Sequence, residues 1–340
     1  MRRLRLFAAA TVLALPATSP LTSAELMDNS PAAVVTDSCG TSCGDCDLSC
    51  CQPAGRTTYA YIEALFLELD NDGGVVGIDQ NTLEERLTLE STDYDFEAGP
   101  RITVGTMGDG LGLEASYFGI RDYNSSASVA GNNNLSLPGD IAFASDDFFG
   151  ADAMQVRTDA EIHNVEFNLL VPSSYEDLTL IAGFRYLHFT EGLDIRSFDS
   201  DSETSDYLIN AQNNLFGAQL GSRVRRQRGI LEFEMVGKAG IFGNDAEQSN
   251  VIGDFGNTFP LRNAESSRGS VAFIGEIGIN GNVELTDGLY LRSGYNVFFI
   301  EGIARAGDQL DFTDTPTSGT STQLGGAFLH GPSVGIEARW

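Results

Sequence analysis

Basic residues are scarce in this sequence, and lysine is almost missing. Lys238 is the only lysine, and 20 Lys and Arg stand against 48 Asp and Glu, which gives a formal net charge of -28. Proteins that bind a phosphate backbone gain affinity when their Lys and Arg side chains release its counterions. A chain this acidic has no such gain, so we expect no nucleic-acid partner.

Long apolar runs are absent as well. No stretch of 18 or more apolar residues occurs in the 340 residues, so no transmembrane helix is predicted. Charged residues are too sparse for a coiled coil, and the 38 glycines are too evenly spread for a collagen. The length is compatible with one to three soluble domains or with one large β-barrel.

The N-terminal segment has the order of features found in a secretory signal. Arg2, Arg3 and Arg5 form a basic head, residues 6–15 form a short apolar stretch, and residues 22–24 offer small side chains before a cleavage point. We therefore predict that residues 1–24 are a cleaved signal peptide and that the protein is exported.

Cysteine occurs only between positions 39 and 51, in the segment CGTSCGDCDLSCC. Four thiolates at these spacings could surround zinc, but in an exported protein such a cluster more often forms disulfides. The odd count leaves one thiol for a link to a second copy or to another envelope protein. We predict disulfides, no metal site and no cofactor, and we interpret residues 25–57 as a flexible periplasmic tether. The disulfide candidates are Cys39, Cys43, Cys46, Cys50 and Cys51.

The remainder of the chain alternates apolar and polar residues with a period of two, which is typical of β-strands. Between Ile230 and Phe242, for example, Phe233 and Met235 share one face and Glu232 and Glu234 the other. Ten such runs are predicted, at about 58–70, 94–107, 111–123, 157–171, 178–192, 207–225, 230–243, 269–284, 288–302 and 326–340. The first run is ambiguous, because both of its faces are apolar.

The connections between these runs alternate in length. Long ones (71–93, 124–156, 193–206, 244–268, 303–325) follow the odd-numbered runs, and tight ones (108–110, 172–177, 226–229, 285–287) follow the even-numbered runs. This rhythm indicates an antiparallel transmembrane β-barrel of about ten strands (8–12) over residues 58–340, with short periplasmic turns and long external loops. Closure satisfies every backbone hydrogen bond within lipid. Apolar side chains would face the outer-membrane lipid, and polar ones the lumen.

Several segments resemble a known family. They are DFEAGPRITVGTMGDGLGLEASYFG (95–119), LIAGFRYLHFTEGL (180–193), NNLFGAQLGSR (213–223), GKAGIFGNDAEQ (237–248) and FLHGPSVGIEARW (328–340). These strand and turn motifs are similar to those of predicted pore-forming outer-membrane β-barrel proteins of Gram-negative bacteria. The resemblance implies the fold, the outer-membrane location and a porin-like activity. The chain also ends in an aromatic residue, Trp340, as such barrels commonly do, which implies recognition by the barrel-assembly machinery.

The parity of the strands predicts which charged residues line the lumen. The acidic candidates are Glu97, Glu114, Glu166, Glu232, Glu234, Glu276, Glu284 and Glu337, and the basic candidates are Arg101, Arg185, Arg223, Lys238, Arg292 and Arg339. Such a mixed set would serve either as a charged path for ions or as a salt-bridged core. Barrels of about eight strands are filled by side chains, whereas wide channels need about sixteen.

These features lead to two functional hypotheses. The first is passive, porin-like passage of small solutes or ions, with a preference for cations because the predicted loops are acidic. The second is a closed barrel that strengthens the envelope or binds partners through its loops. An enzyme is not expected, because His163 and His188 have the apolar parity of their strands, and an odd offset places His330 and Ser333 on opposite faces. The acidic series around Glu68 and Asp70 has calcium-loop spacing but lacks flanking helices, so it predicts no ion site.

Overall fold

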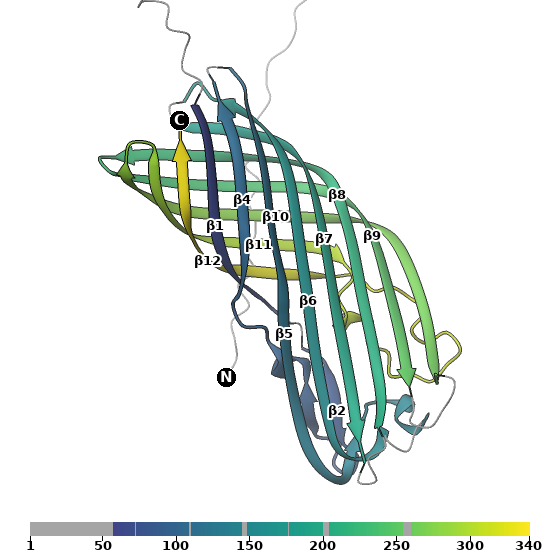
Figure 1. Cartoon of the computed structure of the whole chain (residues 1–340). Coiled ribbons are helices and arrows are strands. Elements are labelled where there is room, and N and C mark those ends of the chain that lie inside the picture. Colours follow the sequence, from purple (N-terminus) through teal and green to yellow (C-terminus); the bar gives the residue numbers. More distant parts are fainter. Residues whose placement is uncertain are drawn as a thin grey trace, which may run out of the picture. The chain divides into compact units, whose positions relative to one another are not determined.

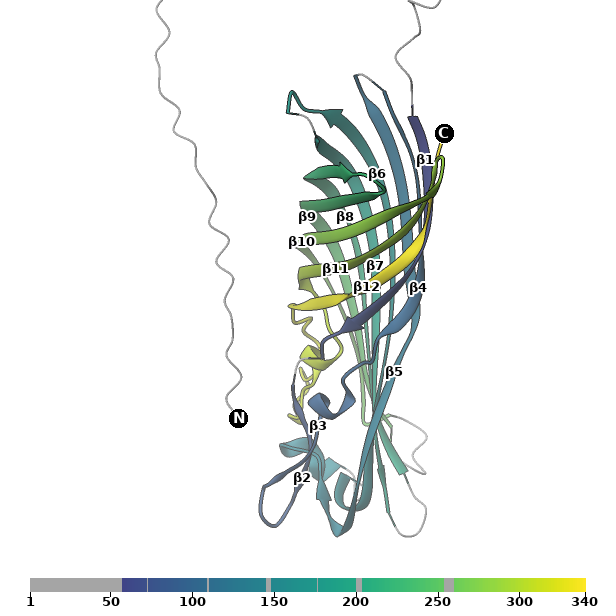
Figure 2. The same ribbon diagram turned by 90° about the vertical axis from the view of Figure 1, so that its left-hand side faces the viewer.

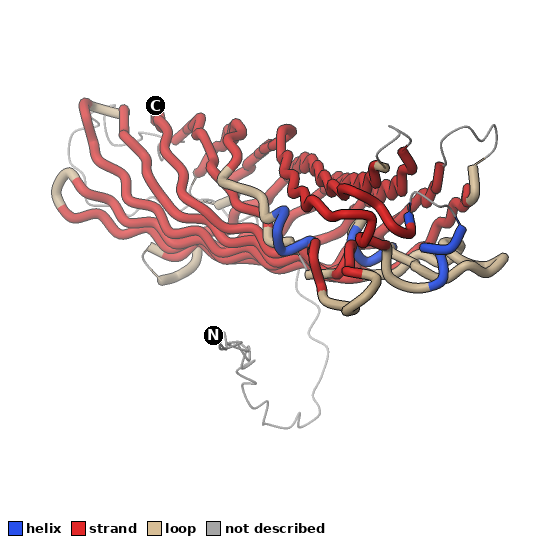
Figure 3. Tube along the Cα trace, turned by 90° about the horizontal axis from the view of Figure 1, so that it is seen from below, coloured by secondary structure: helices blue, strands red, loops and turns tan. Residues whose placement is uncertain are grey.

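The computed structural model describes residues 57–340, apart from residues 72, 109, 145–147, 176, 200–203 and 254–259. The predicted signal peptide, nearly all of the tether and the five cysteines lie outside the described residues, so those assignments stay predictions. Strands make up most of the described chain, with short 3-10 turns at one side (Figure 3). No helix among the described residues is long and apolar enough to span a membrane.

Ten strands close into an antiparallel barrel, as the alternation predicted (Figure 1). They are β1 (Thr57–Leu69), β4 (Glu97–Met107), β5 (Gly112–Ser136), β6 (Phe149–Pro172), β7 (Leu178–Phe198), β8 (Thr204–Arg228), β9 (Leu231–Gly253), β10 (Arg262–Thr286), β11 (Leu289–Ile303) and β12 (Gly325–Arg339). Each strand pairs with its neighbours in this series, and β1 pairs with β12 to close the ring.

The tight turns lie at one end of the barrel, the upper end in Figure 1, and the long connections at the other, which we call the external end. Two of the turns have only two residues between strands, and each contains a glycine with positive φ, Gly229 at 62° and Gly288 at 73°. L-residues with a side chain seldom adopt this conformation, so glycine suits both of these tight turns.

The strands from β5 to β10 are longer than the predicted runs. They span 21 to 25 residues, against 11 to 15 for β1, β4, β11 and β12, so one side of the wall extends well beyond the other (Figure 2). Most of the segments predicted as loops at 124–156, 193–206 and 244–268 are therefore strand. Those loop assignments were wrong because the segments are rich in Ser, Asn and Gly, which have low β-propensity, yet each continues an existing ladder.

The connection from β1 to β4 also contains regular structure. It forms a hairpin of β2 (Val75–Asp79) and β3 (Glu85–Thr88) and a 3-10 turn, η2 (Leu89–Thr92). Strand β2 pairs with the external end of β5, where β4 no longer reaches. Two further 3-10 turns, η3 (Asp140–Ala144) and η5 (Gly307–Gln309), lie in the connections after β5 and β11.

The polarity of the two faces reverses along the long strands. On β8, Phe216, Leu220 and Val224 are exposed on the outer face, whereas Arg223 is buried inside. Toward the external end of the same strand the order is opposite: Tyr207, Ile209 and Ala211 are buried, and Asn210, Gln212 and Asn214 face outward. The prediction of apolar residues outside and polar residues inside thus holds only for the part of the strands near the tight turns, whose apolar outer face matches lipid. Toward the external end the apolar side chains face inward and the polar ones outward, as in the sheet of a soluble protein.

Candidate functional site

The lumen at membrane level contains the predicted charged side chains. All fourteen predicted residues point inward. Twelve of them take part in ion pairs with one another, whereas Glu97 and Glu284 belong to no ion pair of the described residues. Whether these residues line an ion path stays a prediction.

Two further charged residues of this layer were missed from the sequence. Glu63 was missed because the first predicted run was ambiguous. Arg225 was overlooked, although it has the same parity as Arg223 on the same strand. With them the network has seven acids and seven bases, a net charge of zero: Glu63, Glu114, Glu166, Glu232, Glu234, Glu276 and Glu337, against Arg101, Arg185, Arg223, Arg225, Lys238, Arg292 and Arg339.

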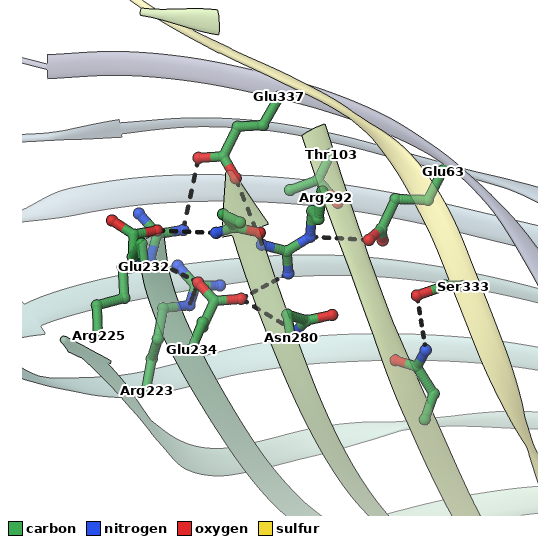
Figure 4. A network of polar contacts seen from close by, with 12 residues as sticks. Glu63, Thr103, Arg223, Arg225, Glu232, Glu234, Asn280, Arg292, Ser333 and Glu337 are labelled. Atoms are coloured by element: carbon green, nitrogen blue, oxygen red, sulfur yellow. Dashed lines mark hydrogen bonds and ion pairs between the residues drawn. The ribbon is translucent and has the colours of Figure 1, made fainter. Parts of the chain in front are cut away.

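Arg292 is the centre of one half of the network (Figure 4). Its guanidinium donates to Glu63 at 2.8 Å, to Glu234 at 2.5 Å and to Glu337 at 3.3 Å, and it lies 4.6 Å from the centroid of the Tyr61 ring. These three carboxylates come from β1, β9 and β12, so a single cation connects three parts of the wall. All four charged side chains are at most 3 % exposed.

The other half of the network crosses the lumen. Lys238 on β9 lies 2.8 Å from Glu166 on β6 and 2.9 Å from Glu276 on β10, and Arg185 on β7 contacts both carboxylates. The cavity left among these groups has a volume of about 30 Å³, enough for only a water molecule or two. In this structure the charged side chains bridge the lumen and leave little free space between them.

An apolar layer fills the lumen next to this network, on the side of the external end. Its twenty buried residues come from nine of the ten barrel strands and from the connection before β4. Phe118 on β5 and Phe298 on β11 meet across the lumen with ring centroids 5.2 Å apart. The Arg101 guanidinium lies 5.5 and 5.8 Å from the centroids of these two rings, so it joins the charged layer to the apolar one. A constriction lined by such side chains excludes water and ions.

The connection between β11 and β12 folds over the external mouth. Arg305 in this connection is buried and pairs with Glu191 of β7 at 2.7 Å, and it donates to the backbone oxygens of Asp70 and Gly326. Further along, Arg262 and Tyr207 hydrogen-bond to the backbone oxygen of Asp311 at 2.7 and 3.2 Å. The lid formed by residues 304–324 is thus attached to several strands of the wall.

The Asp311 carboxylate holds the lid in shape. It accepts hydrogen bonds from the backbone N and the Oγ1 of Thr313 and from the backbone N of Gly319. Partial burial would by itself raise the pKa of this carboxyl, but the hydrogen bonds and the nearby Arg262 outweigh burial and lower the pKa below its ordinary value of 3.8.

The three histidines lie on the outer face of the barrel. His163 and His188 are cross-strand partners in β6 and β7, and His163 bonds to the hydroxyl of Tyr117 at 2.9 Å. His330 faces outward, whereas Ser333 is buried inside, so the two residues stand on opposite faces of β12. Nowhere in the described chain does a histidine face the lumen, where it would serve as a general base.

Comparisons with known proteins give a family but no activity. The family model described as "Putative beta barrel porin-7" matches residues 68–332. No curated protein matches the chain.

Three of the solved structures that match are outer-membrane barrels. The outer membrane protease OmpT of Escherichia coli is 9% identical, with a TM-score of 0.43 over 84% of this chain and 97% of that one. The autotransporter NalP translocator domain of Neisseria meningitidis is 12% identical, with a TM-score of 0.35 over 84% of this chain and 88% of that one. A major outer membrane protein of Thermus thermophilus is 10% identical, with a TM-score of 0.33 over 84% of this chain and 99% of that one. Likenesses this distant transfer no activity.

Proposed function

The chain belongs to the "Putative beta barrel porin-7" family of bacterial outer-membrane barrels, and we propose that its own barrel is closed at rest and serves as a structural element of the outer membrane. In this role the membrane-level part anchors the protein, and the extension of β5–β10 with the lid presents a rigid surface outside. The predicted cysteine-rich tether would connect the barrel to a second copy or to another envelope protein on the periplasmic side.

The observation that carries this proposal is the pair of layers in the lumen. A neutral charged network with a cavity of only about 30 Å³ is covered by an apolar layer, and the lid covers that layer in turn. An ion that crosses the lumen would have to lose its hydration water at the apolar layer, where no charged group of the network can replace that water. Removal of the lid alone would therefore leave the passage closed.

Single-channel recording from refolded full-length protein in planar bilayers tests the proposal. The wild type should give no steady conductance. A variant that hydrates the apolar layer (Phe118→Ser, Phe242→Ser, Phe298→Ser) and also removes one ion pair that fills the lumen beside it (Arg185→Ala, Glu276→Ala) should produce conductance steps. A matched variant on the lipid face, Phe299→Ser, should stay silent. A stable conductance of the wild-type protein would contradict the closed barrel.

Porin-like passage is the second candidate, and the family description favours it. In that case the closed lumen is one of two states, and the apolar layer and lid must move aside. Selectivity would then come from the acidic outside of the protein, because the charges of the network cancel. We expect a preference for cations at low salt that fades as the Debye length falls to about 3 Å at 1 M. Reversal potentials across a salt gradient measure this preference, and an anion preference would contradict it.

A further inference from the structure

The seam that closes the barrel carries a group of three possible metal ligands on its outer face. Glu68 of β1 and His330 of β12 are direct cross-strand partners, and Asp70 follows Glu68 two residues later. One ligand atom from each residue lies within 4.8 Å of the other two. None of the ion pairs of the described residues involves the carboxylate of Glu68 or of Asp70.

The imidazole of His330 is held in a defined orientation. Its Nδ1 shares a hydrogen bond of 2.9 Å with the Tyr295 hydroxyl, and its ring stacks on Tyr295 with centroids 6.2 Å apart. The rings of Phe96 and Phe328 pack against it at 6.1 and 5.3 Å. A histidine that binds a metal usually engages its second nitrogen in this way, which fixes both the tautomer and the direction of the free lone pair.

The backbone that carries Asp70 is fixed as well. Its N–H donates to the Phe328 oxygen at 3.1 Å, and its carbonyl accepts from the Arg305 guanidinium at 3.2 Å. Arg305 is itself anchored by Glu191. The backbone of both acids is therefore held by hydrogen bonds, and only their side-chain torsions need to adjust to a ligand.

We propose that Glu68, Asp70 and His330 bind a zinc ion, with Nε2 of His330 and one oxygen from each carboxylate as ligands and with Nδ1–H of His330 donating to Tyr295. One nitrogen with two oxygens suits zinc, whereas calcium and magnesium prefer oxygen ligands alone. Tetrahedral ligands about 2.0–2.1 Å from zinc lie roughly 3.3 Å apart. The three residues have ligand atoms within 4.8 Å of one another, and rotation of the two carboxylate side chains would bring their oxygens to that separation from Nε2. Water would complete the fourth position.

Such an ion would clamp the first barrel strand to the last. It would connect β1 to β12 at the external end of their ladder, close to the point where the lid is attached through Arg305. A ligand that binds only the folded protein stabilises it by mass action. Zinc should therefore raise the temperature at which the closed barrel opens.

Zinc titration of refolded full-length protein, followed by calorimetry, tests the site. The five cysteines provide other ligands, so the measurement is the difference between the wild type and matched variants. Glu68→Gln and His330→Gln should each lose one equivalent of bound zinc and the zinc-dependent rise in unfolding temperature. His188→Gln, which removes another outward histidine, should keep both. Tyr295→Phe should retain the equivalent with an affinity about tenfold weaker.

Cobalt(II) gives an independent spectroscopic readout. The site should contribute the absorption of a tetrahedral nitrogen and oxygen complex, without thiolate charge transfer, and Glu68→Gln should remove that contribution. Equal zinc stoichiometry and equal thermal shifts for the wild type and both ligand variants would overturn the proposal. Neither result depends on conductance, so a conducting barrel would leave this site unaffected.

Discussion

The rings of Phe118 and Phe298 lie 5.2 Å apart, although their strands, β5 and β11, are separated by three others around the barrel. A contact between such distant strands means that the two walls meet inside. The two rings fill the lumen at the level where the charged network ends, so under the proposed closed barrel the stability of the wall and the closure of the lumen depend on the same side chains.

Phe298→Ala should therefore destabilise the barrel by about 3–5 kcal/mol, the usual loss for a buried phenylalanine. Phe299→Ala is the matched control, because its ring is 43% exposed on the lipid face and detergent can close over the shortened side chain. Urea unfolding in detergent micelles measures both. Equal losses for the two variants would mean that the inner layer is not packed.

This layer also shows how far the sequence could lead. Alternation predicted all ten barrel strands, because a lipid-facing residue at every second position leaves a clear period of two. The first run, at about 58–70, was ambiguous only because both of its faces are apolar. In the structure that ambiguity has a cause, since Leu65, Leu67 and Leu69 belong to the inner apolar layer.

Other parts of the site could not be predicted from parity. Alternation says which face a residue occupies but not its height or its partner, so the cross-lumen pair of Lys238 and Glu166 was out of reach. The same limit applies to Glu68 and His330, which are 262 positions apart and meet only because the first strand pairs with the last. The reversal of polarity on β8 lies within the predicted run 207–225, but one assignment of apolar residues outside and polar residues inside was applied to the whole strand.

Removal of Arg292 should be among the most damaging single changes in the lumen. Arg292→Met would leave Glu63, Glu234 and Glu337 without their shared cation at a depth where water cannot replace it. Breaking a buried pair in this way costs about 3–5 kcal/mol.

The control for Arg292 is Arg226→Met. Arg226 pairs with Asp177 but its side chain is 70% exposed, so its loss should cost no more than about 1 kcal/mol. Equilibrium unfolding in micelles compares the two variants, and a loss near the control value for Arg292→Met would show that the network is hydrated and open.

The reversal of polarity on β8 predicts the position of the membrane boundary. Leu220 is 70% exposed in the middle of the outward apolar stretch, and Leu220→Arg should cost about 2–4 kcal/mol, as expected for arginine at the bilayer midplane. Gln212→Arg changes the same face of the same strand in the external part and should be neutral within about 0.5 kcal/mol. Refolding into lipid vesicles measures both free energies. Equal tolerance of the two substitutions would contradict the boundary.

The attachment of the lid should depend on pH through Asp311. The pKa of its carboxyl is lowered in the folded protein by the hydrogen bonds from Thr313 and Gly319, despite the opposing effect of partial burial. A group whose folded pKa is depressed stabilises the folded state at pH values above its unfolded pKa, and this contribution is lost as the pH falls through the folded pKa. The lid should therefore stay closed at neutral pH and loosen only below the ordinary aspartate pKa of 3.8.

Hydrogen exchange of the amides in residues 307–323, corrected for the intrinsic rate, reports this opening. Asp311→Asn should increase exchange at neutral pH and flatten the acid dependence, whereas Asp314→Asn, at an exposed position in the same lid, should change neither. An acid dependence that survives in Asp311→Asn would assign the effect to another carboxylate.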